Sequence, residues 1–130
     1  TKLALVIEDS GTRRVEVLTI TRDSGSYPIK LNPGLVIQAV LGTPSAVSWQ
    51  DTNTIRLLET TASNLTAVSD YPLSGPRLPV TFPPAVGIKV VPGPAALSTY
   101  LLADDGSIWV LSGSSWRKTG LSGSDVSGLR

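Results

Sequence analysis

Chemistry in this 130-residue chain would have to come from carboxylates, hydroxyls and a few basic side chains, because it contains neither histidine nor cysteine. The carboxylates are scattered along the sequence: Glu8, Asp9, Glu16, Asp23, Asp51, Glu59, Asp70, Asp104, Asp105 and Asp125. A glycosidase needs two carboxylates that flank one sugar bond, and no spacing here selects such a pair. No histidine, and no identifiable lysine, activates any of the many serines as a nucleophile. The sequence therefore predicts no catalytic residues and a protein that is not an enzyme.

Two acidic segments that end in glycine invite comparison with ion-binding loops: Asp23-Ser24-Gly25 and Asp104-Asp105-Gly106. A calcium loop needs several oxygen ligands at alternate positions, and the second segment followed by Ser107 offers too few. Asp favours the start of a hairpin turn, and Gly accepts the positive φ that such turns require. We therefore predict two hairpin turns, no metal site and no cofactor.

The tryptophans are the other residues with binding chemistry. Trp49 and Trp109 are predicted to fill the core. Trp116 lies in a short polar run beside Arg117 and Lys118, and Trp and Arg dominate the hot spots of protein interfaces. We predict Trp116, Arg117 and Lys118 as candidate partner-binding residues. The alternative is that this basic and aromatic face stacks on sugar rings of the cell wall.

Short strand-like runs, separated by turn residues, must position these side chains. The most regular series occupies residues 46–49, 54–60, 65–71 and 77–82. Four short antiparallel strands in a row are typical of one blade of a β-propeller. Pro79 lies inside the fourth run, which suits an outer edge strand because a missing N–H is tolerated there.

The same pattern recurs on both sides, as expected for a propeller. Downstream of that series, strand-like runs occupy residues 86–91, 95–103, 107–111 and 116–119. Upstream of it, similar runs occupy residues 3–7, 14–20 and 27–31. The apolar run at residues 33–41 also favours a strand. The sequence predicts an all-β fold with about three antiparallel four-stranded blades, an incomplete propeller. The predicted divisions are a partial blade at residues 1–32, blades at 33–83 and 84–119, and a loose Ser/Gly-rich tail at 120–130.

Charge and hydropathy limit the partners. The net charge is +1, and no basic cluster is present, so no nucleic-acid partner is expected. The sequence has no signal peptide, lipidation motif or long apolar run. Its abrupt start inside a strand-like run suggests a fragment of a longer protein. Because an open arc of blades leaves faces uncovered, we also expect self-association.

At this point a family resemblance is visible. It is carried, in order, by Leu3-Ala4-Leu5-Val6-Ile7 and Val15-Glu16-Val17, by Ala46-Val47-Ser48-Trp49 before Thr54-Ile55-Arg56-Leu57-Leu58, and by residues 102–109 and Ser115-Trp116-Arg117. The series resembles the carboxy-terminal β-propeller region of the LpqB lipoproteins of actinobacteria, over nearly the whole chain.

The resemblance implies a function that the residues alone do not. Proteins of that family carry an amino-terminal lipid anchor, a middle domain and a carboxy-terminal propeller. They act outside the membrane as accessory proteins of the MtrB sensor histidine kinase, in envelope homeostasis and cell division. The expectation is therefore a non-catalytic, extracytoplasmic interaction module, anchored to the cell membrane through its parent lipoprotein. The alternative is a carbohydrate- or cell-wall-binding module.

Overall fold

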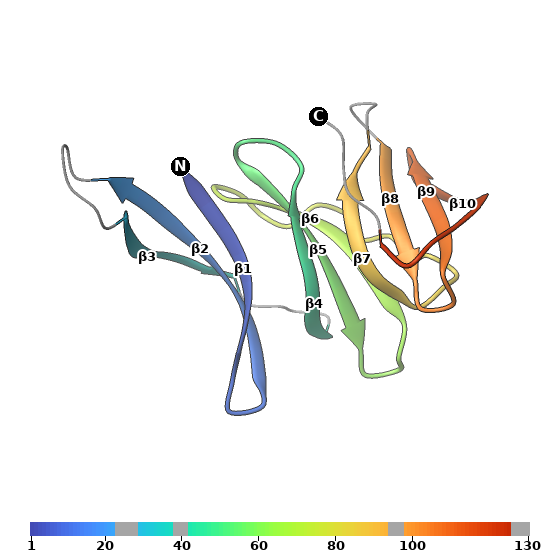
Figure 1. The fold of residues 1–130 in the computed structure, drawn as a ribbon, viewed down its shortest axis with the longest axis horizontal. Helices are drawn as coiled ribbons and strands as arrows, with labels where there is room; N and C mark the ends of the chain where they lie inside the picture. The colour runs from blue at the N-terminus through green and yellow to red at the C-terminus, as the bar shows by residue number, and fades with distance from the viewer. Residues whose placement is uncertain (23–28, 38–41, 94–97, 126–130) are drawn as a thin grey trace.

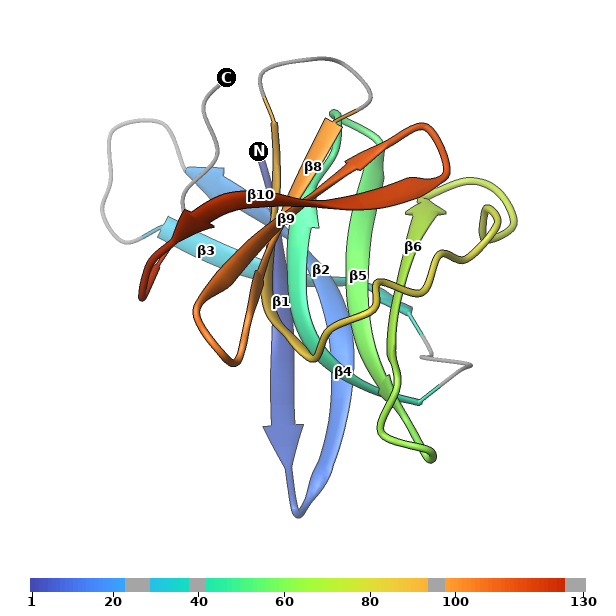
Figure 2. The same cartoon turned by 90° about the vertical axis from the view of Figure 1, so that its right-hand side faces the viewer.

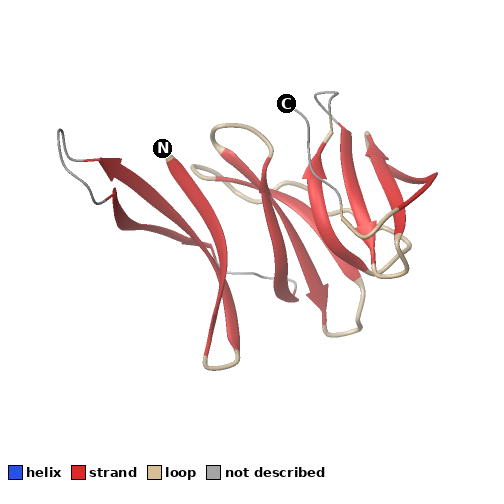
Figure 3. Ribbon diagram, viewed as in Figure 1, coloured by secondary structure: helices blue, strands red, loops and turns tan. Residues whose placement is uncertain are grey.

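The structure is a computed structural model that describes residues 1–22, 29–37, 42–93 and 98–125. All regular elements in these residues are β-strands, with no helix among them (Figure 3). The strands are β1 (Lys2–Asp9), β2 (Thr12–Arg22), β3 (Ile29–Ile37), β4 (Gly42–Trp49), β5 (Thr54–Thr61), β6 (Thr66–Pro72), β7 (Gly87–Pro92), β8 (Ser98–Ala103), β9 (Ser107–Ser112) and β10 (Ser115–Ser122).

The strands pair in chain order into three antiparallel sheets, β1-β2-β3, β4-β5-β6 and β7-β8-β9-β10. Figure 1 shows the three sheets side by side along the long axis of the molecule, with the second sheet in the middle. The first strands of the sheets are neighbours, since β4 contacts both β1 and β7. In Figure 2 the strands of the third sheet fan out from β7 to β10, as expected for a strongly twisted blade. This arrangement confirms the predicted all-β, incomplete propeller-like fold.

The strand predicted at residues 77–82 does not form, and this is a correction to the four-stranded second blade. The segment runs beside β6 and forms only one bridge, in which Val68 and Thr81 exchange backbone hydrogen bonds of 2.8 and 2.9 Å. Its proline-rich sequence explains the difference: Pro76, Pro79 and Pro83 supply no N–H groups, so a regular ladder cannot continue. We call residues 77–82 the strap.

The divisions between sheets also fall later than predicted. Strand β3 crosses the predicted boundary at residue 32 and ends at Ile37. Strand β10 continues through the start of the predicted tail to Ser122. Beyond it, Gly123 N donates to Gly106 O at 2.9 Å, and Asp125 pairs with Lys89 at 2.7 Å. The predicted turn Asp23-Ser24-Gly25, residues 38–41 and 95–97 of two predicted runs, and residues 126–130 lie outside the described residues.

A first core cluster joins the first and second sheets. It contains buried side chains from both: Val15, Val17, Ile37, Ile55, Leu57 and Tyr71. Ala4, Val6 and Trp49 pack against it. Val15 and Val17 alternate with polar neighbours along β2, which is the period-two pattern of a strand with one buried face.

A second core cluster joins the second and third sheets. Its buried members are Leu58, Val68, Val90, Leu101 and Ala103, with Trp109 and Trp116 packed against it. Because Leu57 belongs to the first cluster and Leu58 to the second, β5 is buried on both faces. Each such leucine contributes roughly 1.5–3 kcal/mol on burial. The second sheet therefore packs against both of the other sheets and holds them in place.

Candidate functional site

The three predicted partner-binding residues lie on β10, the edge strand of the third sheet. Trp116 is half-buried, whereas Arg117 and Lys118 are exposed. Register places Trp116 opposite Leu111, Arg117 opposite Val110 and Lys118 opposite Trp109. Since side chains alternate along a strand, Trp116 and Lys118 share the face toward the second sheet, and Arg117 lies on the other face. The structure thus brings two of the three residues together and separates the third.

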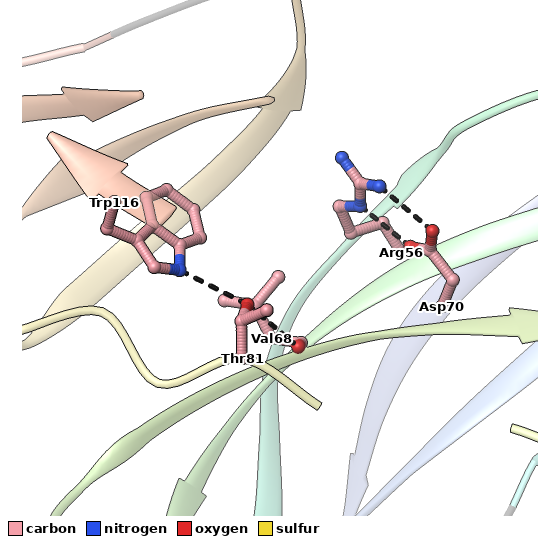
Figure 4. Close-up of polar contacts among 5 residues, drawn as sticks. All are labelled: Arg56, Val68, Asp70, Thr81 and Trp116. Atoms are coloured by element: carbon pink, nitrogen blue, oxygen red, sulfur yellow. Dashed lines mark hydrogen bonds and ion pairs between the residues drawn. The ribbon is translucent and has the colours of Figure 1, made fainter. Parts of the chain in front are cut away.

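Trp116 reaches across to the second sheet. Its indole Nε1 donates a hydrogen bond to Thr81 Oγ1 at 3.1 Å (Figure 4). Thr81 belongs to the strap, and its hydroxyl donates to the backbone oxygen of Val68 at 3.3 Å. At this point β10 and the β9–β10 turn lie against the strap and β6. We call this line of contact the seam. Trp116 is therefore both a core-packing residue and part of the seam's surface.

An ion pair lies in the same seam, on the other side of Thr81 (Figure 4). Arg56 Nε and Nη2 donate to Asp70 Oδ1 and Oδ2 at 2.7 and 2.8 Å, a bidentate arrangement. The Arg56 side chain is only 9% exposed and that of Asp70 18%. Arg56 and Asp70 are directly opposite each other on β5 and β6, with side chains on the face toward the third sheet. The pair was not predicted from the sequence. A short turn joins β5 to β6, and the register of such a hairpin would have placed these two residues opposite each other.

A small cavity of about 120 Å³ opens beside this ion pair. Its walls come from β5 and β6, from the strap, and from the end of β9 with its turn: Arg56, Ser69, Asp70, Thr81, Leu111 and Gly113. We call it the Arg56 pocket. Thr81 lines this pocket and also accepts the hydrogen bond from Trp116, so the pocket and the aromatic side chain are parts of one surface.

A larger cleft of about 510 Å³ lies at the end of β4 and beside the start of β1. Trp49 packs against the first core cluster, and it also lines this cleft together with Lys2, Asp51 and Asn53. The backbone amide of Asn53 donates to Asp51 Oδ1 at 2.7 Å, which fixes the turn that carries both polar side chains. The sequence predicted a core role for Trp49 and did not indicate its second position in a cleft.

The segment Asp104-Asp105-Gly106 forms the predicted hairpin turn between β8 and β9. Gly106 has a φ of +83°, and its amide donates to Ala103 O at 3.0 Å. Asp105 accepts hydrogen bonds from the Ser107 hydroxyl at 2.5 Å and from the Ser107 amide at 2.9 Å. These bonds hold the pKa of the Asp105 carboxyl below its usual range. Ser107 Oγ in turn accepts from Trp109 Nε1 at 3.0 Å, so Trp109 is anchored to the turn as well as to the second core cluster.

One carboxylate is fully buried between the first and second sheets. Glu59 accepts a hydrogen bond from the Tyr71 hydroxyl at 3.0 Å and another from the Gly42 amide at 3.1 Å. Burial is the main cause that raises the pKa of the Tyr71 hydroxyl above its ordinary value. Across the described part of the chain, no three His, Cys, Asp or Glu side chains gather in a group that could hold a metal ion.

The described residues also include no helix with the length and apolar character needed to cross a membrane. No curated protein and no solved structure matches the chain. The model of one protein family does match, over residues 1–125, and its description is "Lipoprotein LpqB beta-propeller domain". The match covers all three sheets and the whole seam. The chain therefore belongs to the LpqB β-propeller domain family.

Proposed function

We propose that this chain is a non-catalytic, extracytoplasmic interaction module that modulates a sensor histidine kinase of the MtrB type in envelope homeostasis and cell division. The observation that carries the proposal is the family match over residues 1–125. A lipoprotein domain is anchored outside the membrane through its parent protein, which would place the module beside the extracytoplasmic domain of such a kinase.

The surface that we assign to the kinase is the seam with β10. It presents the half-buried Trp116 next to the exposed Lys118, and Trp is among the residues favoured at interface hot spots. Arg117, on the opposite face of the same edge strand, would extend the contact around that edge. Trp116 is held in place by its hydrogen bond to Thr81 and by its packing against the second core cluster.

A binding titration of the chain against the purified ectodomain of an MtrB-type kinase tests this proposal. We expect saturable binding that weakens in Arg117→Gln and Lys118→Gln, because each change removes one positive charge from the edge strand. Arg13→Gln is the matched control, since Arg13 is also exposed but lies on β2 of the first sheet, outside the seam. Absence of binding, or equal loss in all three variants, would refute the assignment.

We also propose that the isolated chain self-associates through its first sheet. Strand β3 is an edge strand, and its Leu31, Leu35 and Val36 side chains are 55%, 46% and 43% exposed. Exposed apolar edges of this kind pair readily with another copy. Light scattering behind size exclusion tests this: we expect a dimer that Leu35→Lys disrupts, and a wild-type monomer at high concentration would rule the dimer out.

The second candidate function is binding of cell-wall saccharide in the Trp49 cleft. An aromatic ring beside Asp51, Asn53 and Lys2 offers a stacking surface for a sugar ring with polar groups for its hydroxyls. The cleft volume of about 510 Å³ suits a small saccharide. Titration with soluble wall saccharides, monitored by Trp fluorescence, distinguishes the two candidates. Saccharide binding lost in Asn53→Ala, with no binding to the kinase ectodomain, would favour this function over the first.

A further inference from the structure

The first sheet has an outer face that none of the other described sheets covers. Figure 1 shows this sheet at one end of the row, with only its inner face toward the second sheet. Ala4, Val6, Val15 and Val17 point inward, because they belong to the first core cluster or pack against it. Side chains alternate along a strand, so the neighbours of these residues point outward. The register joins them into one apolar face: Leu3, Leu5 and Ile7 on β1, Leu18 and Ile20 on β2, and Leu31 on β3.

This outer face has the composition of a buried face without its burial. None of the six apolar side chains is buried, and Leu31 is 55% exposed. On β5 of the second sheet, by contrast, Leu57 and Leu58 belong to opposite faces and both are fully buried. The charged side chains within the outer face, Arg14 and Glu16, form an ion pair of 2.7 Å. A partner could therefore cover this face without burying an unpaired charge.

The third sheet, at the other end of the row, offers no open apolar face in the part of the chain that the structure describes. Leu102 and Ile108 are paired on its face away from the second sheet, and they are only 2% and 9% exposed. The chain beyond β10 reaches this face, since Asp125 pairs with Lys89, which lies opposite Leu102. A head-to-tail contact between copies therefore finds no open partner there. A second copy can offer the same outer face of its own first sheet, which gives a two-fold, closed contact.

Area indicates the order in which such an assembly forms. Strand β1 has eight residues, so one first sheet is about 26 Å long and about 14 Å wide, with roughly 370 Å² of flat face. A stable interface covers about 800 Å² of each partner, which one such face does not reach. Pairing of β3 with β3 of a second copy doubles the face to roughly 740 Å². When two identical strands pair antiparallel, the two-fold axis is perpendicular to the sheet, so both outer faces lie on the same side.

We propose that the outer face of the first sheet is a docking surface for a second copy of the same face: two dimers, each joined through β3, pack these faces together and form a closed tetramer. The two joined sheets lie about 10 Å apart, as packed sheets do. The second and third sheets lie on the inner side and leave the contact free (Figure 1). This proposal rests on the proposed self-association through β3, which it extends by naming the surface of the next contact.

Sedimentation velocity of the full chain over a series of concentrations tests this surface. We expect a dimer at low concentration and a tetramer at high concentration. Leu18→Lys should stop assembly at the dimer, because β2 is the central strand and an edge contact does not reach it. Thr19→Lys is the matched control, since it places the same charge at the next, exposed position of β2, on the opposite face. The control should keep the tetramer.

Leu3→Lys is the second variant, because β1 is the strand farthest from the β3 edge. It decides the matter if circular dichroism shows that Leu18→Lys does not fold. A wild-type dimer at every concentration, or a tetramer that both variants retain, would overturn the docking surface and leave the proposed β3 dimer standing. A wild-type chain that is monomeric throughout would refute the β3 dimer and this proposal together.

Discussion

Trp116 and Thr81 are joined by a hydrogen bond of 3.1 Å from the indole Nε1 to the threonine Oγ1, although they lie thirty-five positions apart in the sequence. The bond connects the edge strand of the third sheet to the proline-rich strap of the second. It fixes the orientation of Trp116 before any partner arrives, so little side-chain entropy is lost on binding. The same residue therefore contributes to stability and to the candidate docking surface.

The first prediction concerns this bond. Trp116→Phe keeps most of the apolar ring but loses the donor, and Thr81→Val loses the acceptor together with the hydroxyl's own bond to Val68 O. Each change should lower the free energy of unfolding by about 0.5–1.5 kcal/mol. Because both variants break one shared bond, the double variant should cost less than the sum of the two. Urea unfolding of the four proteins measures the coupling, and strictly additive losses would contradict the bond.

The second prediction compares a buried ion pair with an exposed one. Asp70→Asn leaves the nearly buried Arg56 guanidinium without its carboxylate. Removing one partner of a buried pair costs up to about 3–5 kcal/mol. Glu8→Gln breaks the exposed pair with Arg13, which should cost less than about 1 kcal/mol. Chemical denaturation of both variants checks the contrast, and equal losses would show that Arg56 is well solvated.

The third prediction concerns the close approach of the second and third sheets at Gly87. A Cβ atom there would lie 2.7 Å from Leu101 Cδ1 and 2.9 Å from Leu58 Cδ1. Both leucines are fully buried, so they cannot move away into solvent. Gly87→Ala should therefore destabilise the fold by about 1–3 kcal/mol through overpacking.

Gly75→Ala is the matched control, because its nearest neighbour, Pro72 Cβ, would be 3.8 Å away. Thermal unfolding should separate the two variants clearly. A Gly87→Ala protein as stable as the control would mean that the second and third sheets pack less tightly than described.

The fourth prediction follows from the lowered pKa of the Asp105 carboxyl. The folded turn favours the ionised form, so this carboxylate stabilises the fold at pH values above its unfolded pKa of about 3.9. The contribution is lost as the pH falls through the lower, folded pKa. Ser107 links Asp105 to Trp109 through two hydrogen bonds. In a pH titration followed by NMR, the Trp109 indole N–H signal should therefore shift with a midpoint pH below the ordinary pKa of Asp, which is about 3.9.

Asp105→Asn should abolish that titration while leaving Trp109 in the core. A midpoint at or above the ordinary Asp value would contradict the role of the Ser107 hydrogen bonds. An unchanged titration in the variant would assign it to another acidic group.

The sequence predicted the strands and turns well because their signals are local. Residues Ser10 and Gly11, for example, form a two-residue hairpin turn with φ values of 52° and 81°, and Gly11 is the residue whose type favours a positive φ. The alternation of Val15 and Val17 similarly identified the buried face of β2. In β1 the sequence favoured the face with Leu3, Leu5 and Ile7, whereas Ala4 and Val6 are the side chains that pack against the first core cluster. The strap was predicted as the fourth strand-like run of the second blade, and its prolines limit it to a single bridge.

The candidate site was harder to predict because it depends on contacts between distant segments. Trp116 was identified from its polar surroundings, but its partner Thr81 lies on another sheet. Arg56 and Asp70 are ordinary charged residues in the sequence, and only the pairing of β5 with β6 makes them a buried pair. The alternation of apolar residues along a strand does not indicate which two sheets become neighbours. The Arg56 pocket therefore could not be found without the structure.

Hydrogen–deuterium exchange of the chain, free and bound to the MtrB-type kinase ectodomain, tests the central claim most directly. If the seam is the docking surface, backbone amides of residues 115–119 and of the strap should exchange more slowly in the complex. The matched variant Lys118→Gln should show weaker protection at the same ectodomain concentration. Protection confined to the Trp49 cleft, or no protection anywhere, would contradict the assignment of the seam as the kinase-binding surface.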